Sequence, residues 1–308
     1  MARKIKGAYS LLVLTKDGIY AARSPNGHWS LVVGKKEGAV VVASESGGFP
    51  NYGVKLVRDI KPGEIVLIKN GDLETKDIIH SERIQFCSFF WVYTAFPNAV
   101  LEGISASLVR KRLGAALARR DIKRGFIPDI VIPVPYSGIF HALGYHEEFC
   151  RQAMEGKISR IPPFDFALLK FPWSGRSFTP PDARTRKFKA HVKLLISGEN
   201  YAGKTVVACD DSVVRGTQTK TVLMPKLRSI GIEDVHLRVS NPPLLSHCPW
   251  GKTTKKGEPL AYRMPEKADR VDFLGVKSLE YNTVEDLVQA IGLPAEQLCV
   301  DCDLVCGS

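Results

Sequence analysis

Two adjacent carboxylates followed by hydroxyl residues carry the strongest chemical signal in this sequence. Asp210 and Asp211 come directly after an apolar run, residues 205–209, and a loop rich in Ser, Thr and Gly follows them. Paired carboxylates suit sugar hydroxyls and a hard divalent cation such as Mg²⁺. Backbone N–H groups and hydroxyls in front of a helix suit an anion such as phosphate. The stretch therefore predicts a site for a ligand that contains ribose, phosphate and Mg²⁺.

The sequence around this stretch alternates between strand and helix patterns. The run at 205–209 has no polar alternation, which is typical of a strand buried on both faces of a parallel sheet. Such alternation favours an α/β fold, whose ligands bind beyond the carboxyl ends of the strands. Both Asp210 and the loop 135–138 lie at strand ends of this kind. The predicted strands are 129–135, 165–170, 205–210 and 235–240, and the predicted helices are 138–154 and 220–230.

The first part of the chain has a different pattern, with short apolar strands separated by turns that contain Gly or Pro. An amphipathic helix is predicted from Val100 to Arg119. A β-rich region therefore precedes the α/β region. Its predicted strands are 10–15, 19–24, 39–45, 54–60 and 64–70.

Composition limits the class of protein. The chain has 308 residues, of which 44% are hydrophobic and 24% charged, as in globular proteins. No apolar segment reaches transmembrane length, and Lys16 and Asp17 interrupt the first apolar run, so no membrane partner and no signal peptide are expected. We expect a cytoplasmic protein. The net charge of +11 suits an anionic partner.

These motifs resemble those of the glutamine phosphoribosylpyrophosphate (PRPP) amidotransferases, or amidophosphoribosyltransferases. DDSVVRGT at 210–217 resembles the PRPP signature of type I phosphoribosyltransferases. PVPYSG at 133–138 resembles the pyrophosphate loop, usually PVPDSG, with Tyr136 in place of the acidic residue, and 170–194 resembles the mobile loop. GAYSLLVLTKDG and VRDIKPGEIVLI resemble the second half of the glutaminase domain.

The resemblance implies a type I phosphoribosyltransferase fold, a parallel sheet flanked by helices. A β-rich partial glutaminase domain of the N-terminal-nucleophile type would precede it. We expect the partial glutaminase-like domain at residues 1–80 and an inter-domain linker and helix at 81–127. The phosphoribosyltransferase domain is expected at 128–265, and a C-terminal segment with cluster cysteines at 266–308.

The implied reaction is displacement of pyrophosphate from C1 of Mg-PRPP by ammonia, which gives 5-phosphoribosylamine for purine biosynthesis. The resemblance assigns catalytic roles to Asp210, Asp211, Lys170, Arg176 and Lys193. It assigns Mg²⁺ to Ser137, Asp210 and Asp211. The PRPP-binding residues would be Ser137, Arg186, Ser212, Val213, Val214, Arg215, Gly216 and Thr217.

Seven cysteines form another candidate site, because an odd number without an export signal argues for thiols or metal ligands rather than disulfides. Thiolates suit iron-sulfur clusters or zinc. The resemblance places a 4Fe-4S cluster on Cys87, Cys248, Cys299 and Cys302, with zinc as the alternative. Cys150 and Cys209 are expected to pack in the core.

The glutamine-site pattern of the family is altered. RDPxGxRP reads RSPNGHWS, with Ser24 and Trp29 in place of Asp and Arg, and the family's nucleophilic cysteine lies upstream of where this sequence begins. We therefore expect no glutaminase activity from this chain, and ammonia from a separate glutaminase subunit, as in a split enzyme. Homo-oligomers are expected by analogy with the family.

Two other functions remain open. The chain could be a non-catalytic PRPP-binding regulator, or a phosphoribosyltransferase for another amine acceptor, contacted by Tyr136 and Phe171. No helix-turn-helix pattern is present, so nucleic acid is not an expected partner.

Overall fold

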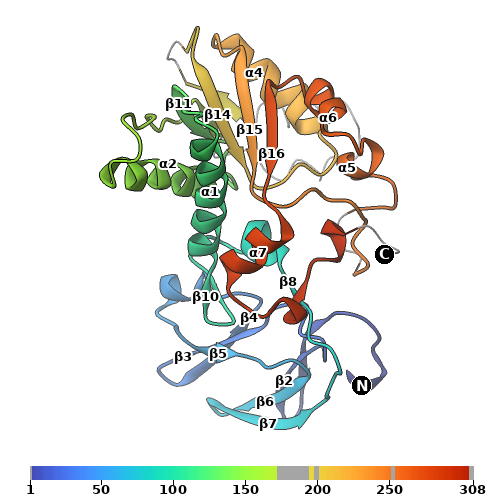
Figure 1. Cartoon of the computed structure of the whole chain (residues 1–308). Coiled ribbons are helices and arrows are strands. Elements are labelled where there is room, and N and C mark those ends of the chain that lie inside the picture. The colour runs from blue at the N-terminus through green and yellow to red at the C-terminus, as the bar shows by residue number, and fades with distance from the viewer. Residues whose placement is uncertain (1, 172–193, 198–200, 251–253, 305–308) are drawn as a thin grey trace. The chain divides into compact units, whose positions relative to one another are not determined.

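The computed structural model describes residues 2–171, 194–197, 201–250 and 254–304, and it contains two compact units (Figure 1). Unit 1 consists of Met1–Val109, Pro249–Lys252 and Val288–Val300. Unit 2 consists of Arg110–Cys248, Thr253–Leu287 and Asp301–Ser308. Unit 1 is rich in β-strands and unit 2 is mixed α/β, so the predicted fold class is confirmed. The finer division at residues 80, 127 and 265 stays a prediction.

Unit 1 contains two antiparallel sheets that share a core. The larger has the order β1 (Ser10–Thr15), β2 (Gly18–Arg23), β6 (Glu64–Lys69), β7 (Asp72–Ile78). The smaller has the order β4 (Ala39–Ala43), β3 (Val32–Lys36), β5 (Lys55–Asp59). Ala21 and Val66 of the larger sheet pack with Leu31, Val33 and Ile60.

The five strands predicted for this region are all present, and two further strands were missed. β7 carries Asp72, Glu74, Lys76 and Asp77, so it lacks the apolar alternation that marks a half-buried strand. β3 ends in glycine and two lysines, which resemble a turn. Tertiary pairing, rather than local preference, makes these segments strands.

Several short elements follow in unit 1. The predicted helix from Val100 is wrong over its first six residues, because Glu102 and Gly103 have positive φ and form the turn of a small ribbon. The helix α1 begins at Ala106 and ends at Lys123. The ribbon consists of β9 (Val100–Leu101) and β10 (Ile104–Ser105).

The other short elements of unit 1 are η1 (Ala2–Lys4), η2 (Phe49–Tyr52), β8 (Phe86–Cys87), η3 (Phe90–Thr94), η5 (Ala295–Gln297) and β17 (Leu298–Cys299).

Unit 2 is built on a four-stranded parallel sheet with the order β11, β14, β15, β16. Side chains of β14 alternate between two cores: Val206 and Ala208 pack in one, and Val207 and Cys209 in the other. The central strand is therefore buried on both faces, as predicted. The strands are β11 (Ile130–Pro133), β14 (Thr205–Asp210), β15 (Asp234–Val239) and β16 (Ser278–Tyr281). The helical elements are α2 (Ile139–Met154), η4 (Thr219–Leu223), α4 (Met224–Ser229), α5 (Leu260–Arg263), α6 (Lys267–Leu274), α7 (Val284–Ile291) and η6 (Asp301–Asp303). The last residues of α7 belong to unit 1.

One predicted strand of this sheet is wrong. Of residues 165–170 only Leu168–Lys170 form a strand, β12, and it pairs antiparallel with β13 (Leu194–Ile196). The only backbone link of this segment to the parallel sheet, among the described residues, is an isolated parallel bridge between Phe164 and Val131 of β11, with the Asp165 N–H donating to the Val131 carbonyl at 3.0 Å. β16, which the sequence analysis missed, is the edge of the parallel sheet beside β15. No helix among the described residues is long and apolar enough to cross a membrane.

A buried ion pair fastens helices of unit 2 to the sheet. The Arg238 guanidinium on β15 donates to both carboxylate oxygens of Asp121 on α1, at 2.6 and 3.1 Å. The Tyr145 hydroxyl on α2 donates to the same carboxylate at 2.6 Å. Asp121 and Arg238 are almost completely buried, so each charge depends on its partner.

Glu64 is expected to make the stability of unit 1 depend on pH. Burial raises the pKa of this carboxyl, but bonds from Arg58, Thr75 and the Lys61 N–H outweigh burial and lower the pKa below its usual value. The stabilisation is therefore present above the unfolded-state pKa and is lost as the pH falls through the lower folded-state pKa. We expect Glu64→Gln to reduce the free energy of unfolding by about 1–3 kcal/mol at neutral pH, and by less below about pH 4.

Urea unfolding followed by tryptophan fluorescence tests this expectation, because Trp29, Trp91 and Trp250 lie in unit 1. Glu74→Gln, on the exposed edge strand β7, is the matched control. An equal loss of stability at neutral and acid pH would contradict the expected role of Glu64.

Candidate functional site

The two carboxylates lie at the carboxyl end of β14, where the sequence places them. The Ser240 N–H donates to the Asp210 carbonyl at 3.0 Å, and the Asn241 N–H donates to the Asp211 carbonyl at 2.8 Å. The Asp211 N–H donates to Asp210 Oδ1 at 2.9 Å, and the Ser212 hydroxyl donates to Asp211 Oδ2 at 2.6 Å. Backbone bonds therefore hold both residues in place at the edge of the sheet.

The electrostatics of this pair favour a cation. Burial, followed by the adjacent charge and hydrogen bond of Asp211, raises the pKa of Asp210 well above its usual value. A divalent cation would remove the repulsion between the two carboxylates, and their oxygen donors are of the hard type that Mg²⁺ prefers. The donor set of Asp210 and Asp211 thus fits the metal that the sequence predicts.

The loop that follows has the form of an anion-binding turn. Gly216 has φ of +73°, and η4 begins three residues later. The Lys220 N–H donates to the Gly216 carbonyl at 3.0 Å, and the Leu260 N–H donates to the Val214 carbonyl at 2.7 Å. Val213 is buried, whereas Arg215 and Thr217 are exposed, and Arg215 is ion-paired with Glu258. Backbone hydrogen bonds and the buried Val213 side chain hold the loop in place, while Arg215 and Thr217 face solvent.

The loop at 133–138, which the sequence also predicts to bind the ligand, lies against β14. The Val134 N–H donates to the Cys209 carbonyl at 2.9 Å. A Cβ on Gly138 would lie 2.3 Å from that carbonyl oxygen, so only glycine fits there. The peptide bond between Pro135 and Tyr136 is cis. Ser137 is therefore carried by a loop that contacts the residue before Asp210.

Lys170 joins this group through an interaction that the sequence analysis missed. Its ammonium lies 4.6 Å from the centre of the Tyr136 ring, within the range of a cation–π contact. Tyr136 as a whole is 61% exposed. The structure thus brings the Ser137 loop close to Lys170 and to the strand end at Asp210. The other three predicted residues of the mobile loop, Arg176, Arg186 and Lys193, lie outside the described residues.

Two of the four predicted cysteine ligands lie in each unit. In unit 1, Cys87 and Cys299 occupy partner positions of the parallel strands β8 and β17, and both are buried. In unit 2, the Cys302 carbonyl accepts bonds from the N–H groups of Leu245 and Ser246, just before Cys248. In the described part of the chain, no group of three or more His, Cys, Asp or Glu residues is arranged to hold a metal.

Of the three remaining cysteines, Cys306 lies outside the described residues, and the other two differ from each other. Cys209 is completely buried, as predicted, and burial raises the pKa of its thiol. Cys150 is only half-buried, and its Sγ lies 3.5 Å from His146 Nε2 on the same helix. Cys150 and His146 are four residues apart in a helix, and this spacing is the sequence signal that could have indicated their contact.

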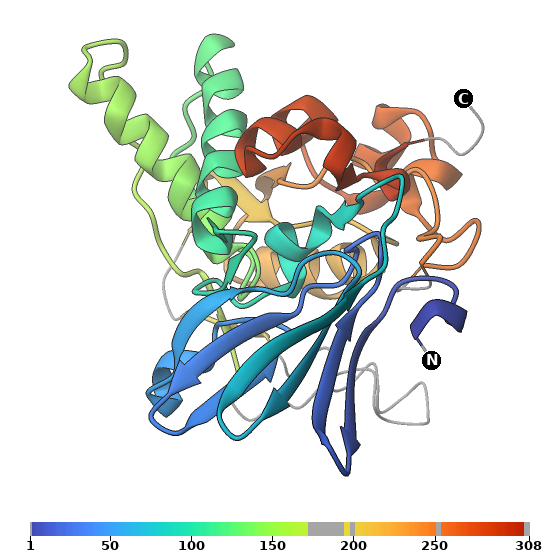
Figure 2. The same cartoon turned by 90° about the horizontal axis from the view of Figure 1, so that it is seen from below.

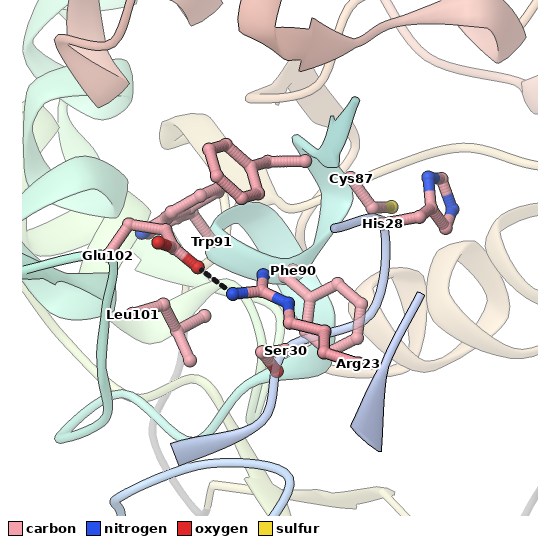
Figure 3. A pocket seen from close by; sticks show the side chains of 9 residues that line it. Arg23, His28, Ser30, Cys87, Phe90, Trp91, Leu101 and Glu102 are labelled. Atoms are coloured by element: carbon pink, nitrogen blue, oxygen red, sulfur yellow. Dashed lines mark ion pairs between the residues drawn. The ribbon is translucent and has the colours of Figure 1, made fainter. Parts of the chain in front are cut away.

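Arg23, His28 and Ser30 of the altered glutamine-site motif line a small pocket in unit 1 (Figure 3). The Arg23 guanidinium donates to the carbonyls of Trp29, Ile60 and Gly27 at 2.7–2.8 Å, and it forms a 2.7 Å ion pair with Glu102. The cavity volume is about 10 Å³, which leaves room for about one water molecule. Internal contacts therefore occupy most of the donors of Arg23.

Comparisons with known proteins identify similar chains. The chain is 33% identical over 287 residues to the amidophosphoribosyltransferase of Archaeoglobus fulgidus, 33% over 317 residues to that of Methanocaldococcus jannaschii, and 34% over 304 residues to that of Methanothermobacter thermautotrophicus. These matches cover 92–98% of this chain but only 59–63% of the relatives, so the chain spans about three fifths of their length. No family profile matches the chain.

A solved structure supports the same relationship. The glutamine PRPP amidotransferase from B. subtilis, complexed with ADP and GMP, has a TM-score of 0.81 and 30% identity, over 96% of this chain and 63% of that one. A structure described as the allosteric regulatory enzyme of purine biosynthesis matches with the same TM-score. The resemblance and the type I phosphoribosyltransferase fold, with a β-rich N-terminal region, are thereby confirmed.

The geometry of the loop predicts that a substitution at Gly216 weakens anion binding. Gly216→Ala would strain the positive φ and bring a Cβ within 2.9–3.1 Å of Leu260, Leu274 and Phe273. We expect about tenfold weaker binding of a phosphate ester such as ribose 5-phosphate, since the N–H groups of the loop would shift. Isothermal titration calorimetry measures this change.

Gly203→Ala is the matched control, because Gly203 has φ of +72° with open space around it and lies at the amino end of β14. Both variants carry similar backbone strain, but only Gly216 belongs to the loop. Equal losses of binding in the two variants would contradict an anion site at Gly216.

Proposed function

We propose, on the premise that this chain is a homologue of the amidophosphoribosyltransferases over nearly its whole length, that it transfers an amino group from ammonia to C1 of PRPP. The products are 5-phosphoribosylamine and pyrophosphate, and the pathway is purine biosynthesis. The observation that carries this proposal is the convergence of the Asp210 loop and the Ser137 loop at one edge of the parallel sheet. A purely structural turn does not require two carboxylates at that edge.

The roles of the carboxylates follow from the reaction. Loss of pyrophosphate leaves positive charge on C1 and the ring oxygen of the ribose, and a fixed negative charge nearby stabilises that transition state. Asp210 and Asp211 are held by main-chain bonds, so they need little reorganisation during the reaction. They also provide acceptors for the ribose hydroxyls.

The remaining residues bind the two phosphate ends. The loop from Ser212 to Thr217 precedes a helical element, and its N–H groups and hydroxyls would bind the 5′-phosphate. Ser137 and Lys170 would contact the pyrophosphate, and Arg176, Arg186 and Lys193 are proposed to close over it. Mg²⁺ held by Ser137, Asp210 and Asp211 would neutralise charge on the pyrophosphate.

We also propose that this chain does not hydrolyse glutamine, and that a separate glutaminase subunit supplies ammonia. This proposal is supported by the contacts of Arg23, which is bonded to three carbonyls and ion-paired with Glu102, and by the pocket of Figure 3, whose volume is about 10 Å³. Ser24 and Trp29 occupy positions where the motif has an Asp and an Arg. Homo-oligomers remain a prediction.

Tyr136 is the observation that favours a variant of this function. Its exposed ring lies beside Lys170 at the pyrophosphate loop, where the motif usually has a carboxylate. An aromatic ring there offers a surface for an amine acceptor larger than ammonia. A phosphoribosyltransferase with a different amine acceptor is therefore the second candidate.

Release of pyrophosphate from Mg-PRPP tests the proposal. We expect release with ammonium but not with glutamine. Asp211→Asn should lower kcat by about 10²–10³-fold, because a fixed charge facing the transition state is lost. Asp234→Asn is the matched control at the amino end of the neighbouring strand β15, and we expect a change of less than about threefold there.

The other outcomes separate the candidates. Release that requires an organic amine would favour the second candidate. Tight binding of PRPP without release by any amine would contradict catalysis and favour a PRPP-binding regulator. No binding of PRPP would contradict all three functions.

The cysteines are proposed to hold a 4Fe-4S cluster, or zinc, as a structural staple. The partner positions of Cys87 and Cys299, and the backbone bonds between Cys302 and the segment that leads to Cys248, support this proposal. Thiolates suit either metal. Electron transfer is not part of the proposed role.

Metal analysis of anaerobically purified protein checks the cysteine site. We expect bound iron and sulfide in the wild type and less than about a tenth of that iron in Cys299→Ser, because a cluster needs all of its thiolates. Cys150→Ser, outside the proposed set, should keep the metal. Zinc in place of iron would support the alternative, and neither metal in the wild type would contradict the site.

A further inference from the structure

A buried side chain after β15 connects the candidate site to the C-terminal turn of unit 2. The Asn241 N–H donates to the Asp211 carbonyl at 2.8 Å. The side-chain Nδ2 of Asn241 donates to Asp303 Oδ1 of η6 at 2.8 Å and to the Pro242 carbonyl at 2.9 Å. Asn241 and Asp303 are only 1% and 4% exposed. Asn241 thus joins the turn at Asp303 to the main chain of Asp211.

The main chain of the same turn is fixed to the same segment. The Cys302 carbonyl accepts hydrogen bonds from the N–H groups of Leu245 and Ser246 at 2.9 and 3.1 Å. The two segments lie side by side in Figure 2, where the C-terminal one is dark red and the one after β15 is orange. Because η6 is held beside residues 241–246, the Asp303 carboxylate is a stationary partner for Asn241.

This cluster contains buried polar atoms that packing alone does not explain. Among the residues that the structure describes, Ser240 Oγ, Asn241 Oδ1 and Asp303 Oδ2 are buried and have no hydrogen-bond partner. Burying a carboxylate is costly, and an apolar side chain at position 303 would avoid that cost. Buried polar groups without partners are uncommon, and a functional role is one reason to retain them. The Asp303 carboxylate therefore points to a role for its bond to Asn241.

The neighbouring residue Ser240 is held independently of Asp303. Its N–H donates to the Asp210 carbonyl at 3.0 Å, and its own carbonyl accepts from Asn282 Nδ2 at 2.9 Å. Asn282 is 1% exposed and follows β16. Loss of the Asp303 carboxylate would therefore loosen the bond at Asp211 and spare the bond at Asp210.

We propose that Asp303, acting through Asn241, is a positioning residue for Asp211. This inference rests on the proposed function, in which Asp211 faces the transition state. The Asp303 carboxylate holds the Asn241 side chain, and the Asn241 main chain holds the Asp211 carbonyl. A carboxylate fixed in this way stabilises developing positive charge without reorganisation, and a misplacement of about 1 Å can lower a rate about 10²-fold.

The kinetics of pyrophosphate release measure this effect. We expect Asp303→Ala to lower kcat about tenfold and to change the KM for PRPP less than about twofold, because the Asp211 carboxylate is misplaced rather than lost. Asn241→Ala, which removes the other end of the contact but keeps the N–H, should have the same effect. Asp303→Asn should keep more than about half of kcat, because asparagine retains an oxygen acceptor for Asn241 Nδ2. Asp301→Ala is the matched control: it removes a half-buried carboxylate from the same turn and should leave kcat unchanged.

A double variant separates positioning from a general loss of stability. Asp303→Ala combined with Asp211→Asn should have the same kcat as Asp211→Asn alone, because no carboxylate remains to be positioned. If Asp303 acted only on stability, the losses of the two single variants would instead add.

Hydrogen exchange tests the contact without the reaction. We expect the Asn241 amide to exchange at least about tenfold faster in Asp303→Ala than in the wild type, because its side-chain partner is lost. The Ser240 amide should exchange at an unchanged rate in Asp303→Ala, and both amides should keep their wild-type rates in Asp301→Ala.

Three results would overturn the proposal: a wild-type kcat in Asp303→Ala, additive losses of kcat in the double variant, or a wild-type exchange rate of the Asn241 amide in Asp303→Ala. Absence of pyrophosphate release from the wild type with any amine would instead contradict the proposed reaction. The exchange rates would then still decide whether Asp303 holds the main chain at Asp211, so the two failures are distinguishable.

Discussion

The parallel pairing of β11, β14 and β15 is the constraint on which the candidate site depends. Because parallel strands end at the same edge, the loops after β11 and β14 must meet there, together with the segment after β15. The Cys209 carbonyl links the two loops, since the Val134 N–H donates to it and a Cβ on Gly138 would collide with it. Ser137 and Asp210 are neighbours of this point, so the chemistry of the site follows from the topology of the sheet.

Each unit must bury the apolar faces of its sheets, and the two units do so to different degrees. In unit 2 the central strand has a core on each face, and the buried charges of Asp121 and Arg238 compensate each other. In unit 1 the core is shared by two sheets of unequal size, and β1 extends past what the described residues cover. The candidate site therefore lies on a sheet that is packed on both faces within unit 2.

The sequence predicted the elements whose own residues determine them. The strand 205–210 and the helix 138–154 are present within one residue of their expected bounds, because continuous apolar runs and helical periodicity are local signals. β3, β7 and β16 were missed, since pairing with neighbours makes them strands. The helix expected from Val100 begins at Ala106, because a two-residue turn at Glu102 and Gly103 interrupts it. The contact between Tyr136 and Lys170 joins residues 34 positions apart, and no periodicity could indicate it.

The interleaving of the two units along the chain has a consequence for folding during synthesis. β8 pairs with β17, and the Ser88 hydroxyl donates to the carbonyl of Cys299, which lies 211 positions later in the chain. At about 5–20 residues per second, the ribosome adds those residues in roughly 10–40 s. During that time all of Arg110–Cys248 in unit 2 is synthesised, while unit 1 still lacks one of its strands. β8, which carries Cys87, therefore cannot pair with β17 until nearly the whole chain has been synthesised.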